Sequence, residues 1–311
     1  MENTNTGTKS IVGNKRTKSL VEHTAKYIFT VFAIVAIVAV FSITAYMIYL
    51  GTPALSSVGV LELLLGTEWR PTAAEPMYGI FYVILTSIVG TAASLLMGVP
   101  IGILTAVFLA EVSNKKLAAV VQPAVELLAA IPSVVYGLIG VMVLKPVMYQ
   151  LERMVFAGSK SHQYTGGANL LSAILVLAIM ILPTVINISA SSIKAVQPSI
   201  KSASLALGAT KIQTIFKVIL PAAKSGIMTA IVLGMGRALG EAMAINMVAG
   251  NSVNLPLPFS SVKFLTTAIV SEMSYSAGIH RQVLFTIGLV LFVFIMITNI
   301  FLTRLIKKGD T

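Results

Sequence analysis

The residues best placed to do chemistry are Arg237 and Glu241, because both stand inside an apolar stretch at about residues 225–250. A charged side chain at the centre of a bilayer costs at least about 3 kcal/mol, so such residues mark candidate substrate or ion pathways. The stretch is expected to be a helix, and a spacing of four places both side chains on one face, where they can approach each other. At a rise of about 1.5 Å per residue, Arg237 is expected near the middle of the membrane.

Two interpretations of this pair are open. In the first, Arg237 and Glu241 form a buried ion pair that fixes helix packing and touches no substrate. In the second, Arg237 supplies a fixed positive charge and a fork of donors for an oxyanion, and Glu241 balances that charge when the pathway is empty. Gly236 and Gly240 form a stripe of small residues beside the pair, which predicts close packing against another helix.

The composition of the chain indicates that Arg237 and Glu241 are held by a transmembrane helix. The chain has 311 residues, of which 56% are hydrophobic and 11% charged, and its mean hydropathy is +0.91. These values are typical of an all-α integral membrane protein that crosses the bilayer several times. Stretches long enough to cross a hydrocarbon core predict six transmembrane helices. They lie at about residues 27–50, 78–110, 117–144, 169–190, 225–250 and 282–305.

Cysteine and histidine usage excludes several kinds of site. The sequence contains no cysteine, so disulfides, thiolate metal ligands and thiol catalysis are excluded. His23, His162 and His280 are scattered without ligand spacing, and we expect no metal site.

The net charge of +11 could suggest nucleic-acid binding, but the distribution of Lys and Arg among the loops indicates membrane topology instead. Fifteen basic residues lie in the N-terminal tail, the 115–116 loop, the 191–224 loop and the C-terminus, whereas six lie in the opposite loops. Because cytoplasmic loops carry the excess of Lys and Arg, both termini are predicted to be cytoplasmic. The predicted parts are a basic tail (1–26), a first transmembrane helix (27–50), an external loop (51–77), a core (78–305) with a cytoplasmic loop at 191–224, and a cytoplasmic C-terminus (306–311).

The N-terminal tail and the single tryptophan each lead to a further expectation. Residues 1–26 are polar and mostly without apolar periodicity, so we expect most of this tail to be disordered. Trp69, the only tryptophan, lies in the external loop and is expected to anchor the chain at the membrane interface.

The loop at residues 191–224 has helical apolar spacing, which predicts two short amphipathic helices joined at Gly208. Gly208 suits a helix end, Thr210 can cap the next helix, and Pro221 marks the turn into the fifth span. Such an element can dock on a cytoplasmic partner or lie on the lipid surface, and its lysines suit both alternatives.

The spacing of Gly208, Val218 and the pair Leu220-Pro221 resembles the docking-loop motif of permease subunits of ATP-binding-cassette (ABC) importers. The Glu-Ala-Ala triplet of that motif falls on Ser202, Ala203 and Ser204, so its acidic residue is missing here. The resemblance implies that this loop is a coupling helix that docks on an ATPase. The implied docking residues are Ser202, Ala203, Ser204, Gly208, Ala209, Thr210, Leu220 and Pro221.

Four further motifs resemble the permeases of the phosphate-specific ABC importers. They are AAIPSVVYG at 129–137, ALGAT at 206–210, LPAAKSG at 220–226 and GRALGEAMA at 236–244. The continuation MVAGN at 247–251 is similar to the PstC-type subunit rather than to its PstA-type partner.

The resemblance implies the importer-type permease core and a subunit that is not itself an enzyme. It implies four partners: a PstA-type second permease, cytoplasmic ATPase subunits that bind ATP and Mg, an extracytoplasmic phosphate-binding protein, and inorganic phosphate. It also implies a bacterial or archaeal cytoplasmic membrane and a pathway that includes Arg237 and Glu241.

Other functions remain open from the sequence. The permease could carry another oxyanion, such as sulfate or molybdate. An ion-coupled secondary transporter, in which Glu241 carries protons, is disfavoured because no second half repeats the first. An intramembrane enzyme lacks a suitable constellation of residues.

Overall fold

The computed structural model describes residues 15–159 and 161–308, and most of them are helical. The chain divides into two compact units, Met1–Tyr49 and Leu50–Thr311. The α-helices are α1 (Lys15–Ser57), α2 (Val60–Leu65), α3 (Phe81–Val107), α4 (Lys115–Ala130), α5 (Ser133–Ile139), α6 (Lys145–Val155), α7 (Leu170–Lys194), α8 (Pro198–Ala206), α9 (Lys211–Thr214), α10 (Leu220–Ala222), α11 (Lys224–Gly240), α12 (Met243–Val248), α13 (Leu265–Glu272) and α14 (Gly278–Lys308). Three π-helical segments, η1 (Phe108–Val112), η2 (Gly140–Leu144) and η3 (Ile215–Ile219), and two strands, β1 (Trp69–Arg70) and β2 (Met77–Tyr78), complete the described elements.

The first unit is formed by most of α1, which begins at Lys15 rather than near residue 27. Residues 15–26 were expected to belong to a disordered tail, and that expectation is wrong for them. A helix that has already nucleated extends easily through good helix formers such as Lys, Arg, Leu and Glu. Residues 1–14 of the expected tail and residues 309–311 of the expected C-terminus lie outside the described residues.

Five segments of the described chain are long and apolar enough to cross a membrane: Glu22–Ser57, Phe81–Val112, Ser133–Val155, Leu170–Lys194 and Gly278–Arg304. A sixth is obtained when the bent pair Lys211–Ala222 and Lys224–Gly240, whose axes differ by 70°, is counted as one span. The chain is therefore a multi-pass membrane protein, and its candidate spans agree with the expected six when the bent pair is included.

The third span differs from the expected 117–144. Helix α4 ends at Ala130, and the candidate span runs from Ser133 to Val155. The separation falls at Pro132, because the residue before a proline is driven out of the helical region. Hydropathy alone missed this boundary, since the apolar sequence continues across the proline.

The expected external loop at 51–77 is largely ordered. Helix α1 extends to Ser57, α2 follows, and β1 pairs with β2 in antiparallel register so that Trp69 lies opposite Tyr78.

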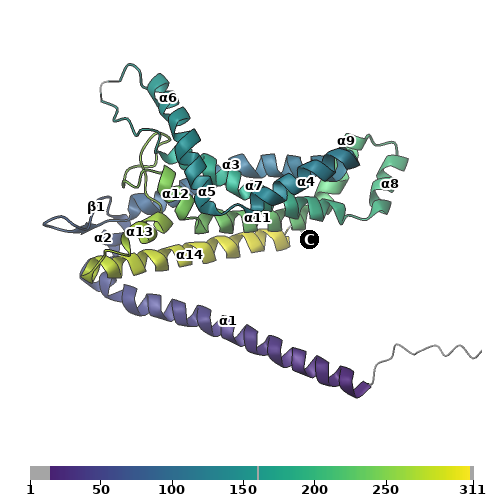
Figure 1. The fold of residues 1–311 in the computed structure, drawn as a ribbon, viewed down its shortest axis with the longest axis horizontal. Coiled ribbons are helices and arrows are strands. Elements are labelled where there is room, and N and C mark those ends of the chain that lie inside the picture. The colour runs from purple at the N-terminus through teal and green to yellow at the C-terminus, as the bar shows by residue number, and fades with distance from the viewer. Residues whose placement is uncertain (1–14, 160, 309–311) are drawn as a thin grey trace, which may run out of the picture. The chain divides into compact units, whose positions relative to one another are not determined.

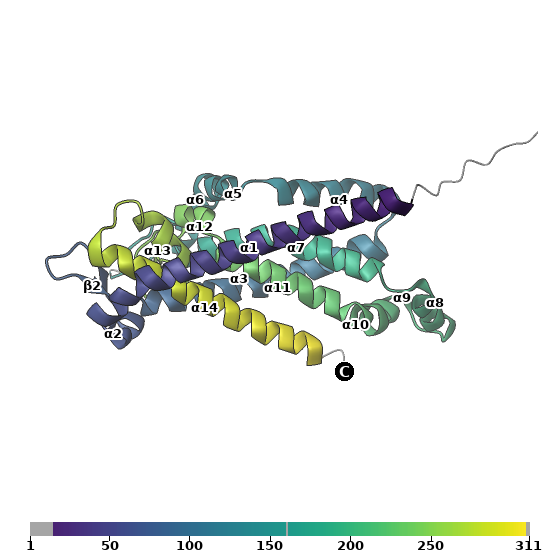
Figure 2. The same cartoon turned by 90° about the horizontal axis from the view of Figure 1, so that it is seen from below.

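Within the second unit, α3 packs against α7 and α11. A Cβ atom on Gly98 would lie 2.7 Å from Cδ1 of Ile181, and one on Gly102 would lie 2.7 Å from Cγ1 of Val185. These two glycines therefore allow α3 and α7 to approach closely, as expected for small residues at a helix interface. In Figures 1 and 2, α8 and α9 lie at one end of these helices, and α2, α12 and α13 lie at the other end.

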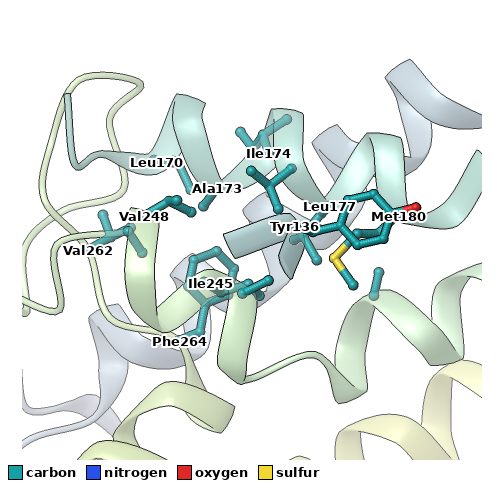
Figure 3. Close-up of a cluster of buried hydrophobic side chains, with 14 of the residues drawn as sticks. Tyr136, Leu170, Ala173, Ile174, Leu177, Met180, Ile245, Val248, Val262 and Phe264 are labelled. Atoms are coloured by element: carbon teal, nitrogen blue, oxygen red, sulfur yellow. The ribbon is translucent and has the colours of Figure 1, made fainter. Parts of the chain in front are cut away.

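A buried apolar cluster joins several of these elements (Figure 3). Leu170 and Leu177 of α7 pack with Ile245 and Val248 of α12 and with Phe264, the residue before α13. The cluster fixes the irregular segment after α11 against α7.

Candidate functional site

Arg237 lies in the last turn of α11 and is half-buried. Among the residues whose side chains are described, no carboxylate forms an ion pair with it and no group accepts a hydrogen bond from it. The carbonyl end of α11 carries the negative pole of the helix dipole, which stabilises a cation in the last turn. The guanidinium group therefore keeps its donors available.

Glu241 lies just outside α11 and forms no ion pair with Arg237 among the described residues, so the first of the two interpretations is not observed in this conformation. The backbone of Glu241 is extended, with φ −74° and ψ 126°, and the helix ends at Gly240. Its Oε1 atom accepts a hydrogen bond of 2.9 Å from the backbone N–H of Ala244 at the start of α12. Its carbonyl oxygen accepts a hydrogen bond of 2.8 Å from Oγ1 of Thr266. The expected continuous helix at 225–250 is therefore wrong, and the spacing of four does not place the two charges on one helical face.

Gly236 and Gly240 are exposed, and a Cβ atom on either would meet no described atom from outside the backbone of its own helix within 4 Å. Within the second unit, no described element makes the expected close packing on this stripe.

The motif residues at 129–137 lie against α12. Tyr136 donates a hydrogen bond of 2.6 Å from its hydroxyl group to the carbonyl oxygen of Leu128, and it lies within electrostatic range of Arg237. A Cβ atom on Gly137 would lie 2.7 Å from Sδ of Met247 and 2.9 Å from Cα of Ala244. Two of the sequence motifs thus meet at the end of α11.

The loop at residues 191–224 has the predicted two-helix form. Helix α8 is followed by Gly208 with φ +84°, a conformation that glycine adopts readily. Thr210 accepts a hydrogen bond of 3.2 Å from the N–H of Gln213, whose side chain caps Thr210 in return. The bend of 70° follows Ala222. The helix end, the cap and the turn near Pro221 are all confirmed.

The predicted docking residues lie mostly on the surface. Ser202, Ala203, Gly208, Thr210 and Pro221 are exposed, whereas Ser204, Ala209 and Leu220 are half-buried. Three apolar side chains of the same loop also face outward: Leu207, Ile212 and Phe216 are 90%, 71% and 51% exposed. Ile215 and Ile219 point inward instead and pack against α3 and α7 residues.

An ion pair that the sequence reasoning missed joins this loop to α3. Nζ of Lys201 on α8 contacts Oε2 of Glu111 in η1. The two residues are ninety positions apart, so no local pattern connects them. The available signal was a lone acid at the cytoplasmic end of the second span, facing a loop rich in lysine.

The sequence analysis also missed two buried carboxylates, which lie far along the chain from the 191–224 loop. Glu272 is 3% exposed and accepts hydrogen bonds from Nζ of Lys263 and from Nε1 of Trp69, the latter at 3.2 Å, and its Oε2 lies 2.8 Å from Nε2 of His280. Trp69 is therefore held by a buried carboxylate, and its role as an interface anchor stays a prediction. Burial raises the pKa of Tyr78, and burial together with the charge of Glu272 raises the pKa of Tyr275.

The second buried carboxylate is Glu152. It accepts hydrogen bonds of 2.9 and 3.0 Å from N and Oγ1 of Thr165, and it lies 2.9 Å from Nε2 of His162. In the part of the chain that the structure describes, no group of three His, Asp or Glu residues could hold a metal ion. We therefore interpret both carboxylates as fixing loops rather than binding metal.

Comparison with known proteins connects this geometry to a family. Residues 98–309 match the family described as binding-protein-dependent transport system inner membrane component. The chain is 38% identical over 291 residues to the probable ABC transporter permease protein YqgH of Bacillus subtilis (strain 168), a match that covers 91% of this chain and 90% of the relative. It is 34% identical over 257 residues to the phosphate transport system permease protein PstC of Haemophilus influenzae, covering 79% and 81%.

The fold is similar to a chain of a bacterial alginate ABC transporter crystallised in complex with an alginate pentasaccharide-bound periplasmic protein. The TM-score is 0.62 at 16% identity, and the similarity covers 91% of this chain and 95% of that one. The likeness shows the importer-permease fold, and the sequence matches extend over most of the chain. The chain therefore belongs to the family of binding-protein-dependent transport system inner membrane components.

Proposed function

We propose that this chain is a transmembrane permease subunit of an ATP-driven importer that moves inorganic phosphate into the cytoplasm. Several relatives named phosphate transport system permease protein PstC are 32–34% identical to it over most of the chain, which supports phosphate as the substrate. The subunit is not itself an enzyme. In this proposal ATP and Mg bind to separate cytoplasmic ATPase subunits, a PstA-type permease completes the pathway, and an extracytoplasmic binding protein delivers phosphate.

The observation that carries this proposal is the unpaired guanidinium of Arg237. It lies beside the stripe of Gly236 and Gly240, which no other described element of the second unit approaches within 4 Å. A guanidinium presents a planar fork of donors that matches two oxygens of a phosphate group. A pathway between this face and the second permease would expose those donors to the passing anion.

The exposed surface of the cytoplasmic loop supports the ATPase part of the proposal. Leu207, Ile212 and Phe216 are exposed beside the predicted docking residues, on a short element that ends at the bend before α11. A partner groove that takes up this surface can move α8 when ATP closes the ATPase subunits. Such movement alternates the access of the pathway between the two sides of the membrane.

The test replaces Arg237 by Gln in proteoliposomes that contain both permeases and the ATPase. Phosphate-loaded binding protein is added to the compartment that faces the external side of the permeases. Loss of a charge-assisted contact of about 2 kcal/mol is expected to reduce phosphate uptake roughly thirtyfold. Arg237→Lys should restore uptake in part, because an ammonium group keeps the charge and loses the planar fork. Arg304→Gln, which removes an exposed charge near the end of α14, is the matched control.

Anion preference should remain with the binding protein. Phosphate at neutral pH retains a proton to donate and sulfate does not, and a closed, desolvated pocket reads that difference best. We therefore expect the phosphate-to-sulfate uptake ratio of Arg237→Lys to equal that of the wild type. Wild-type uptake in Arg237→Gln would contradict the role of Arg237, and an altered ratio in Arg237→Lys would place selectivity in this subunit.

A further inference from the structure

Helix α8 is attached to the rest of the chain by few contacts. None of its residues is buried, and its apolar side chains Ile200 and Leu205 are exposed. Apart from Lys201, the polar side-chain contact recorded for α8 is the 3.0 Å hydrogen bond between Ser204 and Thr214, which stays within the same cytoplasmic loop. Apolar packing alone therefore does not hold this helix in place.

The ion pair of Lys201 with Glu111 is the charged contact that leads from α8 to a membrane-spanning segment. The Glu111 side chain is only 9% exposed and that of Lys201 is 37% exposed. This pair is less screened than one in open water, because water and salt reach the carboxylate poorly. Among the described acids, Glu111 is the one that pairs with a lysine of this loop.

Glu111 is joined rigidly to the core. It lies in η1, which continues α3 without a break and ends with the N–H of Ser113 donating to the carbonyl oxygen of Phe108 at 2.7 Å. A π-helical turn of this kind is frequently found at functional positions. Helix α3 packs against α7 and α11, so a force on Glu111 is carried by packed helices to the element that holds Arg237.

We propose that the ion pair between Lys201 and Glu111 is the connection through which displacement of α8 moves α3. The inference rests on the proposed function, because α8 is displaced only if an ATPase subunit binds it. Both residues act by positioning: neither touches the substrate. Without the pair, α8 follows the ATPase while α3 stays behind, so ATP is hydrolysed without a matching movement of the spans.

The test compares phosphate uptake with ATP hydrolysis in the complete reconstituted complex. Glu111→Gln and Lys201→Gln should retain the ATPase during purification and keep basal ATP hydrolysis. The number of phosphate ions taken up per ATP hydrolysed should fall about fivefold or more. A factor of about five corresponds to the lower end of typical coupling free energies. A role limited to folding would lower protein level or ATPase retention and would leave this ratio unchanged.

A double variant decides whether the pair itself is responsible. Glu111→Lys combined with Lys201→Glu reverses the two charges, and it should bring the ratio most of the way back to the wild-type value. Lys116→Gln, an exposed lysine at the start of α4 on the same side, is the control and should leave the ratio unchanged.

The outcomes are separable. Unchanged ratios in both single variants, or a double variant as uncoupled as the singles, would overturn the proposal. If the single variants lose the ATPase, recovery of both ATPase retention and the ratio in the double variant supports the pair, and failure to recover overturns it. A wild-type complex that hydrolyses ATP without phosphate uptake would contradict the proposed function instead.

Discussion

The carboxylate of Glu241 accepts the N–H of Ala244, while its backbone carbonyl accepts the hydroxyl group of Thr266. One residue thus connects the end of α11, the start of α12 and the start of α13. A carboxylate engaged as a helix cap does not neutralise Arg237 in this conformation. The charge of Arg237 is partly stabilised by the carbonyl end of its own helix.

The first prediction separates the cap from the charge at Glu241. Glu241→Gln keeps an acceptor oxygen for Ala244, so the melting temperature of the purified complex should stay close to that of the wild type. Glu241→Ala removes the acceptor and should cost about 1 kcal/mol, or roughly 2 °C in a chain of this size. Thermal unfolding in detergent would measure both. Equal losses in the two variants would show that the charge, rather than the cap, stabilises this segment.

The sequence identified Arg237 and Glu241 as residues of interest because charge inside an apolar stretch is conspicuous in any single chain. Their relation was mispredicted, because the rule for residues four apart holds only in an unbroken helix. The break is held by Thr266, which is 25 residues away from Glu241. A contact between residues so far apart in the sequence cannot be predicted from a local pattern.

At the scale of elements, the loop at residues 191–224 could be predicted closely because its signals are local. The positive φ of Gly208, the capping box of Thr210 and the bend near Pro221 each depend on residues within one or two turns. The third span was placed wrongly for the opposite reason. Its boundary at Pro132 stands inside a long apolar stretch, so the strongest signal, hydropathy, does not change there.

The second prediction concerns the helix end at Gly208. Gly208→Val should strain the backbone by about 1 to 2 kcal/mol, because a β-branched residue is disfavoured at positive φ. A Cβ atom would meet nothing within 4 Å, so crowding contributes little within this chain. We expect a near-normal protein level with weaker ATPase co-purification and reduced phosphate uptake.

Gly208→Asn is the matched control, since asparagine tolerates the left-handed region and should retain most of the uptake. Normal uptake and ATPase retention in Gly208→Val would favour the alternative that the loop lies on the lipid surface.

At the scale of the whole molecule, the loops of the second unit separate into two groups at opposite ends of its long helices (Figures 1 and 2). Helices α8 and α9 lie at one end, and α2, α12 and α13 lie at the other. The excess of basic residues in the 191–224 loop predicts that the first group is cytoplasmic. The domain boundaries drawn from the sequence remain predictions, as does the cytoplasmic location of both termini.

The third prediction tests this orientation with single cysteines, which is direct because the natural chain has none. Ser56→Cys and Ser161→Cys should react with a membrane-impermeant thiol reagent in intact cells. Ser191→Cys and Thr210→Cys should react only after the membrane is opened. All four positions are exposed, so burial does not account for a missing signal. Labelling of Thr210→Cys from outside would overturn the docking assignment.

The bend at Ala223 gives α11 the mechanics of a lever. The helix begins at this 70° bend and stops at Gly240, so a tilt of α11 about Ala223 displaces its far end the most. Arg237 lies about 21 Å from the pivot, and a rotation of about 5° carries it sideways by about 2 Å. That displacement exceeds the range over which a hydrogen bond keeps its strength. In the proposed function, a small tilt at the bend is therefore enough to make or break a contact between Arg237 and an anion.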